Sequence, residues 1–471
     1  MLKDDFIKKL SQNLSYTPTE EQALVMAKLV TFVFRATGRE VFLLKGYAGT
    51  GKSSLVGALV KTLTQFSMKS VLLAPTGRAA KVFGLYSDTP AYTIHKKIYR
   101  QKTFSPDMTG FTLTINRHKQ TLFIVDEASM IASSADSSSD LLSDLIEYVY
   151  SSPGCKLVLI GDTAQLPPVG QTNTPALEPL ALEDYELKVT EVTLTEVVRQ
   201  TLTSGILYNA TNLRQMLQDE YIETPKIELK RFADIKNITG AELLESLEES
   251  YSRCGKDETI IVTRSNKRAN IFNDGVRARI LYREEELESG DLLMVSKNNY
   301  YWGEKIEQID FIANGDVAQV LRVKSYNEMY GFRFADVTLR LLDYDVDIDA
   351  KIMLDTLHLE YPSLTPELNN QFFNKVMEDY ADVRTKRERI KRVKTDKWFN
   401  ALQVKYAYAV TCHKSQGGQW QNVFIDMGNI PEESVNVDFI RWLYTAFTRA
   451  TEKLYLINTP KYFLLDSSEE L

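Results

Sequence analysis

Four short apolar runs divide the first 165 residues, and a turn rich in polar residues or glycine follows each of them. The runs cover residues 41–44, 71–74, 122–125 and 157–160. Apolar runs of this length, bounded by turn signals, are typical of buried strands in a parallel sheet. Residues 55–60 begin an apolar helix after the first run, so the pattern predicts an α/β domain.

The pattern changes between residues 97 and 120, where short alternating segments replace the apolar runs. Residues 111–115 alternate apolar and polar side chains, and a turn-rich cluster at 106–110 precedes them. Alternation beside a turn cluster predicts a small β-hairpin inserted into the α/β domain. An ordinary surface excursion explains the same pattern, and the residues alone leave both interpretations open.

Residues 290–401 have a third character. Apolar positions at 317–323 and 337–342 predict short strands of a small barrel. Residues 365–367 form a helix-capping signal, and helix is predicted from there to about residue 402. The basic residues of this helical stretch are Arg384, Lys386, Arg387, Arg389, Lys391, Arg392, Lys394 and Lys397. Two interpretations of them stay open, a solvated helix face and a surface that tracks phosphates.

Composition places this chain among ordinary globular proteins. Its 471 residues predict two to four domains, and no apolar run reaches the roughly 20 residues of a membrane span. The three cysteines and four histidines are dispersed, without metal-ligand spacing. The net charge of −7 disfavours a protein that coats nucleic acid but permits a narrow basic channel. We expect a cytoplasmic protein, because residues 1–5 do not resemble a signal peptide.

Residues 46–53 form a glycine-rich loop between a predicted strand and a predicted helix. In such loops, backbone N–H groups and the helix N-terminus bind phosphates, while Lys52 reaches the β- and γ-phosphates and Ser53 ligates Mg²⁺. The predicted nucleotide contacts in the loop are Gly46, Ala48, Gly49, Thr50, Gly51, Lys52, Ser53 and Ser54. ATP with Mg²⁺ is the expected ligand.

Three polar residues that follow the later strands complete the predicted site. Asp126 and Glu127 end one strand, where one carboxylate can hold Mg²⁺ and the other can polarise the attacking water. Gln165 follows the next strand and is placed to sense the γ-phosphate. Gln22 lies shortly before the loop, where its amide can bond the adenine edge; alone it reads as an exposed helical glutamine.

The ordered motifs together resemble the superfamily 1 DNA helicases, in particular the RecD-like and phage Dda-like branch that moves 5′ to 3′. The first half supplies 46–53, Pro75-Thr76, 126–129 and 161–168. The second half supplies 194–200, 260–266, 408–417 and 443–450. The resemblance spans residues 16 to about 455.

The resemblance implies two RecA-like domains that close on one ATP. The first would cover 1–185, interrupted by the hairpin at 97–120, which would split duplex DNA at a fork. The second would cover 186–289 and 402–471, interrupted at 290–401 by an SH3-like and helical insert. Arg199 and Arg449 would reach from the second domain to the γ-phosphoryl group, and Gln416 and Gly417 would join the nucleotide site.

The resemblance also assigns residues to a single-stranded DNA path. These are Pro75, Thr76, His95, Phe111, Arg264, Asn266, Thr411 and His413. A channel of this kind needs aromatic platforms for bases, and Phe83 and Tyr92 are both candidates.

The predicted function is ATP-dependent translocation on single-stranded DNA and unwinding of duplex DNA. The expected protein is a monomer without membrane contact that meets DNA forks and single-strand binding, replication or repair proteins. Two alternatives stay open. One is an RNA-directed helicase of the same superfamily, and the other is an ATP-gated single-strand binding or loading module that does not unwind.

Overall fold

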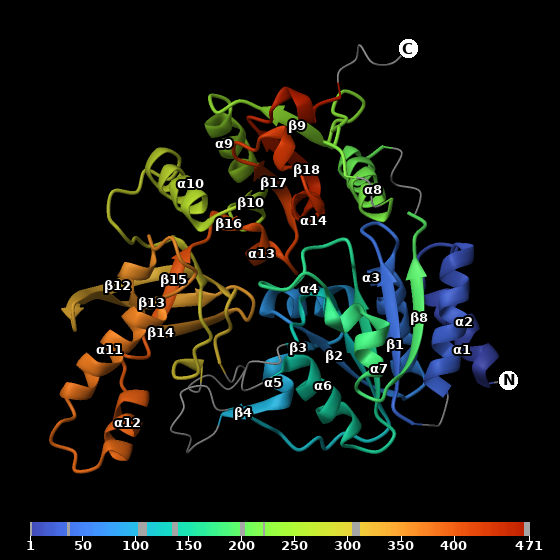
Figure 1. Ribbon diagram of the computed structural model, residues 1–471, viewed down its shortest axis with the longest axis horizontal. Helices are drawn as coiled ribbons and strands as arrows, with labels where there is room; N and C mark the ends of the chain where they lie inside the picture. The colour runs from blue at the N-terminus through green and yellow to red at the C-terminus, as the bar shows by residue number, and fades with distance from the viewer. Residues whose placement is uncertain are drawn as a thin grey trace.

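The computed structural model describes residues 2–34, 38–101, 111–133, 140–197, 203–219, 222–303 and 311–465. Within these residues the chain forms two α/β units and a closed barrel (Figure 1). Figure 1 shows one parallel sheet above the other, with the barrel and its two helices beside them. None of the described helices is long and apolar enough to cross a bilayer.

The first α/β unit is built on a six-stranded parallel sheet with the order β3-β2-β6-β7-β1-β8. Its strands are β1 (Glu40–Gly46), β2 (Lys69–Ala74), β3 (Ala91–Thr93), β6 (Thr121–Val125), β7 (Lys156–Gly161) and β8 (Lys188–Leu194). Separate apolar clusters cover its two faces. The helices are α1 (Leu2–Asn13), α2 (Glu20–Phe34), α3 (Lys52–Gln65), α4 (Gly77–Ser87), α5 (Ile94–Ile98), α6 (Leu141–Tyr150) and α7 (Pro179–Glu183).

The expected hairpin strands are present beside this sheet. β4 (Tyr99–Gln101) and β5 (Phe111–Leu113) pair as a two-stranded antiparallel sheet. The second strand is two residues shorter than its apolar and polar alternation predicts. The turn cluster at 106–110 lies outside the described residues.

The second α/β unit has a five-stranded parallel sheet with the order β16-β10-β17-β18-β9. Its strands are β9 (Ile235–Ile238), β10 (Thr259–Thr263), β16 (Ala409–Thr411), β17 (Trp420–Asp426) and β18 (Ala450–Ile457). Its helices are α8 (Gly205–Gln218), α9 (Leu243–Cys254), α10 (Asn266–Arg279), α13 (Cys412–Ser415) and α14 (Val437–Phe447).

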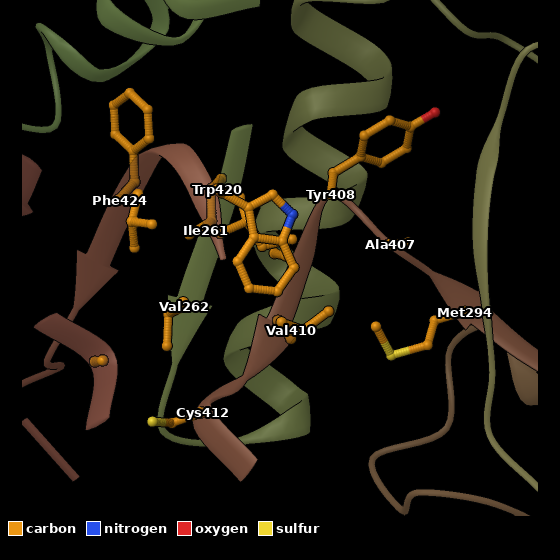
Figure 2. Packing of buried hydrophobic residues seen from close by; sticks show 14 of the residues in the cluster. Ile261, Val262, Met294, Ala407, Tyr408, Val410, Cys412, Trp420 and Phe424 are labelled. Carbon is orange, nitrogen blue, oxygen red and sulfur yellow. The ribbon is translucent and has the colours of Figure 1, made fainter. Parts of the chain in front are cut away.

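The expected barrel closes through five strands and interrupts the second α/β unit. The strands are β11 (Leu292–Val295), β12 (Val317–Met329), β13 (Phe332–Leu341), β14 (Val346–Met353) and β15 (Leu402–Tyr406). Barrel and second sheet share one apolar core. Figure 2 shows how this core continues from Met294 in the barrel, past Tyr408, to Val410, Ile261 and Trp420 in the sheet.

Three predicted boundaries shift. β8 belongs to the first sheet, so that unit extends to Leu194 rather than ending at residue 185. β15 closes the barrel, so the insert runs beyond residue 401 to Tyr406. The predicted long helix is two helices, α11 (Pro366–Glu378) and α12 (Lys386–Lys394), because Thr365 caps the first and Thr385 caps a new start.

Candidate active site in the cleft between the two sheets

The phosphate loop joins β1 to α3 at the carboxyl edge of the first sheet, where ligands bind in open α/β folds. Gly49 and Gly51 have φ of 78° and 82°, a left-handed conformation that side chains disfavour. Ser53 and Ser54 lie in the first turn of α3. Lys52 Nζ donates to the carbonyl oxygens of Gly46 and Tyr47, at 2.7 and 2.8 Å. The loop carbonyls thus hold the Lys52 ammonium group, which the sequence motif predicts will contact the phosphates.

Asp126 directly follows β6, the neighbour of β7 in the sheet centre. Its carboxylate accepts hydrogen bonds from the Tyr86 hydroxyl and from Glu127 N–H, the latter at 2.8 Å. Burial and the adjacent Glu127 carboxylate raise the pKa of Asp126 to about 6. Glu127 has a left-handed backbone, with φ of 52°, which is costly for this residue type and common at functional sites.

These residues fit ATP and Mg²⁺. Mg²⁺ sites in nucleotide enzymes use one or two protein oxygens, with phosphates and water as the other ligands. The half-buried Asp126 carboxylate and the Ser53 hydroxyl provide such oxygens, and a cation would relieve the cost of desolvating the carboxylate. Within the described residues no cluster of three histidine, cysteine or acidic side chains forms an all-protein metal cage.

Gln165 lies in the loop after β7, as predicted for a phosphate sensor. Its side chain is 6% exposed, and its Oε1 atom is buried without a hydrogen-bond partner. An unpaired buried acceptor is costly, and the role of Gln165 as a sensor of the γ-phosphate stays a prediction.

Gln22 is almost fully buried rather than exposed on its helix. Its Nε2 donates to Thr50 O at 3.0 Å and to Tyr16 OH at 3.3 Å. Its Oε1 accepts from Thr19 N–H at 3.1 Å. The residue therefore braces the phosphate loop, and a role at adenine stays a prediction.

The second unit closes over this site through α14. Tyr444 accepts a hydrogen bond from Ala48 N–H at 2.9 Å and donates to Asp162 Oδ2 at 2.5 Å. Thr445 Oγ1 accepts from Leu166 N–H at 2.9 Å. Figure 1 shows α14 descending from the second sheet toward the first. The helix therefore joins the phosphate loop to the loop that follows β7.

Arg449, the predicted finger, is 3% exposed and lies just after α14. Its guanidinium donates to Thr445 O at 3.0 Å, Gly418 O at 3.1 Å and Thr448 Oγ1 at 3.1 Å. All three partners belong to the second unit. A catalytic contact across the cleft would require the guanidinium to exchange these partners.

Arg199, the other predicted finger, lies outside the described residues. The segment before it belongs to the first unit, because Glu21 accepts from Thr195 N–H and Glu196 N–H at 2.8 and 2.9 Å. Val197 reaches the phosphate loop, where a Cβ on Gly49 would lie 2.9 Å from its Cγ1. The expectation that this segment starts the second unit is therefore wrong for residues up to Val197.

Gln416 and Gly417 lie at the interface between the units. Gln416 Nε2 donates to Leu166 O at 2.8 Å. Gly417 has φ of 72°, and a Cβ there would lie 3.1 Å from Thr76 Oγ1. Only glycine allows this close approach between the two units.

Seven of the eight predicted nucleic-acid residues share one topological position, and Phe111 in β5 is the exception. The seven lie at or just after the ends of β2 and β3, the last two strands at one edge of the first sheet, or of β10 and β16, which hold the same place in the second. The residues are Pro75, Thr76 and His95 in the first unit and Arg264, Asn266, Thr411 and His413 in the second. A path across both sheet edges would pass all seven.

Individual side chains on this path differ in what they offer. Thr76 caps α4 by accepting from Ala79 N–H at 3.2 Å. Arg264 lies over the ring of Phe439, 5.6 Å from its centroid. Burial lowers the pKa of His95, so its imidazole is neutral at pH 7 and can donate a hydrogen bond but no charge. Phe111 lies in β5.

The two aromatic residues predicted to stack on bases differ in their exposure to solvent. Phe83 is fully buried in the first unit's core, so it cannot stack on a base, and that prediction is wrong. Tyr92 is 38% exposed, with Lys96 and Lys97 ammonium groups 5.7 and 5.4 Å from its ring centroid. Phe83 lies on the inner face of α4, an orientation that one apolar residue in a mixed helix does not reveal.

The sequence analysis missed three residues that the site brings together. Tyr444 and Asp162 lie inside motifs that it quoted, so their positions were available as a signal. Tyr86 lies on α4 within no motif, and its contact with Asp126 arises only from tertiary packing.

Comparison with known proteins agrees with this geometry. Residues 18–225 match the AAA domain family, and residues 406–457 match the UvrD-like helicase C-terminal domain. The chain is 23% identical to an uncharacterised protein, R530, of Acanthamoeba polyphaga mimivirus, over 92% of this chain and 98% of that protein. It is 26% identical to the ATP-dependent RecD2 DNA helicase of Deinococcus radiodurans over 95% of this chain. That match covers 49% of the Deinococcus protein, so the chain spans about half its length.

A solved structure of Pif1 helicases at forked double-stranded DNA aligns with 96% of the chain at 19% identity. The alignment covers 94% of the Pif1 chain, and the TM-score is 0.49. The chain thus matches an AAA domain in its first half and a UvrD-like helicase C-terminal domain near its end, and it is similar to the RecD2 protein over most of its own length.

Proposed function

We propose that this protein is an ATP-dependent DNA helicase that moves along single-stranded DNA from 5′ to 3′ and separates duplex DNA. The observation that carries the proposal is the hydrogen-bonded interface between the two units. A phosphate loop and two acidic residues on one sheet face a helix of the second unit, and that helix hydrogen-bonds both loops of the site.

The chemical step assigns each side chain one task. Lys52 and the loop amides would bind the phosphates, and Glu127 would orient the attacking water. Mg²⁺, held by Ser53 and Asp126, would neutralise charge on the phosphates. Arg199 and Arg449 would stabilise the charge that develops on the γ-phosphoryl group. For this contact Arg449 would have to leave its present partners in the second unit.

The mechanical step follows from the location of the interface. ATP that contacts both units binds the closed cleft more tightly than the open one, so binding favours closure and hydrolysis releases it. The nucleic-acid residues lie at the same edges of the two sheets, so closure would shorten the path between them. Alternating grip by the two units would then advance one strand.

We also propose that the barrel is the SH3-like insert and that the β4–β5 hairpin divides the duplex.

A strand-displacement assay with matched DNA and RNA tails tests this function. We expect ATP-dependent displacement with a 5′ DNA tail, and much weaker activity with a 5′ RNA tail. ATP hydrolysis stimulated by single strands without any displacement would instead indicate a binding or loading module. Stronger activity on RNA would indicate an RNA-directed helicase.

A further inference from the structure

Tyr444 connects the second unit to the backbone of the phosphate loop. Its side chain is 1% exposed, and both hydrogen-bond partners of its hydroxyl lie in the first unit. The hydroxyl accepts from Ala48 N–H, an amide of the loop that cradles phosphates, and donates to the Asp162 carboxylate. One oxygen atom therefore connects the nucleotide loop, the loop after β7 and α14.

The contact continues into the parts of the site that must move. Asp162 Oδ1 accepts from Ala164 N–H at 2.9 Å, which fixes the start of the loop that carries Gln165. Thr445, the next residue on α14, accepts from Leu166 N–H in the same loop. Thr445 O in turn accepts from Arg449 Nε at 3.0 Å. A shift at Ala48 therefore reaches both the predicted sensor and the predicted finger through hydrogen bonds.

The connection depends on the tyrosine hydroxyl, because this group both donates and accepts a hydrogen bond. A phenol oxygen can accept one hydrogen bond and donate another at the same time, and phenylalanine can do neither. Without the hydroxyl, the half-buried Ala48 N–H and the buried Asp162 carboxylate would each lose a partner. A nucleotide bound at the loop would compete for the Ala48 N–H, and the hydroxyl of Tyr444 would then pass that change to Asp162 and α14.

We propose that Tyr444 is a positioning residue that couples nucleotide binding at the phosphate loop to the grip of the second unit on single-stranded DNA. This inference rests on the proposed function, because it presumes that both ligands bind. It assigns the coupling to one hydroxyl group rather than to the cleft as a whole.

A matched pair of variants tests the coupling. Tyr408, like Tyr444, is fully buried, and its hydroxyl accepts from a backbone N–H, that of Leu292, and donates to a carboxylate, that of Asp291. Both of its partners lie next to the shared barrel core instead of across the cleft. Tyr408→Phe therefore removes an equivalent hydroxyl at a place with no link to the phosphate loop.

The measurement is the dissociation constant of a labelled single-stranded DNA oligonucleotide with and without a non-hydrolysable ATP analogue and Mg²⁺. Coupled sites typically change each other's affinity by about 5- to 150-fold, reciprocally. We expect such a ratio in the wild type and in Tyr408→Phe, and a ratio within about twofold of one in Tyr444→Phe. Analogue affinity without DNA should change by less than about threefold in Tyr444→Phe, because the other loop amides remain.

Asp162→Asn provides an independent test that leaves the tyrosine ring in place, and it serves alone if Tyr444→Phe fails to fold. It weakens the acceptor of the same hydroxyl, so its ratio should also fall, and the double variant should be no worse than Tyr444→Phe. A wild-type ratio in Tyr444→Phe, or an equal loss in Tyr408→Phe, overturns the inference. A wild-type protein that binds neither ATP nor DNA overturns the proposed function as well.

Discussion

Each sheet has an aspartate at the end of a corresponding strand, but the two aspartates have different partners. Asp126 follows β6 in the first sheet and accepts hydrogen bonds from Tyr86 and Glu127, while no ion pair joins it to a described residue. Asp426 ends β17 in the second sheet and is held by Arg268, with N–O distances of 2.8 and 3.0 Å. One fold thus supplies a carboxylate available to a ligand and a carboxylate already neutralised.

This difference explains how two similar α/β units divide one task. A buried carboxylate without a cation lowers the stability of the free protein, and its binding to a ligand can offset that cost. A carboxylate paired with arginine contributes to the fold and has little left to offer a ligand. Under the proposed function, the first unit would bind the nucleotide and the second would move against it.

The largest effect is expected from removing the charge at the phosphate loop. Lys52→Ala should lower the rate of ATP hydrolysis on the order of 10³-fold, because no other described residue replaces an ammonium group within the loop. Single-strand binding should remain measurable, since the predicted DNA residues lie at the sheet edges. Lys61→Ala, an exposed lysine on the same helix, is the control and should hydrolyse ATP at the wild-type rate. Turnover retained in Lys52→Ala would refute the site.

A pair of carboxylate variants tests the comparison itself. Asp126→Asn should abolish hydrolysis yet raise the free energy of unfolding at pH 7.5 by about 1–3 kcal/mol, because it removes a desolvated charge. Asp426→Asn should lower the same quantity by about 1–2 kcal/mol, because the partly exposed Arg268 loses its partner. Urea unfolding at constant salt measures both, and changes of the same sign in the two variants contradict the comparison.

The pH dependence of the Asp126 effect has a defined sign. The folded-state pKa of about 6 lies above the ordinary value of 3.8, so between these values the folded protein binds the proton more tightly. Stability from this group therefore falls as the pH rises through that window, and the full cost is present above about pH 6. The gain from Asp126→Asn should shrink as the pH falls toward 4. A gain that does not vary between pH 4 and 7.5 would show that burial of charge is not its cause.

The next largest effect is expected from deleting the hairpin inserted in the first unit. Deleting residues 103–114, which include β5, should impair unwinding while sparing DNA-stimulated ATP hydrolysis. The cleft residues and both sheet edges lie outside this segment, so turnover does not depend on it. Parallel assays of displacement and hydrolysis measure the two activities, and equal loss of both would argue against strand separation by the hairpin.

The smallest effect is expected at the aromatic platform. Tyr92→Ala should weaken single-strand binding by about 1–3 kcal/mol, the typical contribution of one stacked base. Tyr282→Ala, an exposed tyrosine of the second unit away from the sheet edges, is the control and should leave affinity unchanged. Fluorescence anisotropy at fixed salt distinguishes the two. Equal affinity of Tyr92→Ala and the wild type would remove Tyr92 from the path.

Short-range sequence patterns predicted most of the strands, helix starts and loops of the fold. The phosphate loop, the strand before Asp126, the start of α2, the hairpin strands and the barrel all carry short-range signals that the structure bears out. The membership of β8 and β15 was missed, because it depends on register with strands far away in the chain. The burial of Phe83 was missed because one apolar residue does not define a helix face.

The cleft was the least predictable part of the molecule. Motif order predicted two halves of a site, but not that Arg449 is held within its own unit or that Val197 reaches the loop. Tyr444 was present in a quoted motif and received no role, because its two partners lie 396 and 282 positions away in the sequence. Contacts across such separations depend on how two folded units meet.

The central claim is that nucleotide hydrolysis in this cleft drives directional movement on single-stranded DNA. A displacement assay on otherwise identical duplexes with a 5′ or a 3′ single-stranded tail tests it most directly, with Lys52→Ala as the inactive reference. We predict ATP-dependent displacement of the 5′-tailed duplex by the wild-type protein and none by the variant. Failure to displace either duplex, or equal displacement by Lys52→Ala, would contradict the claim.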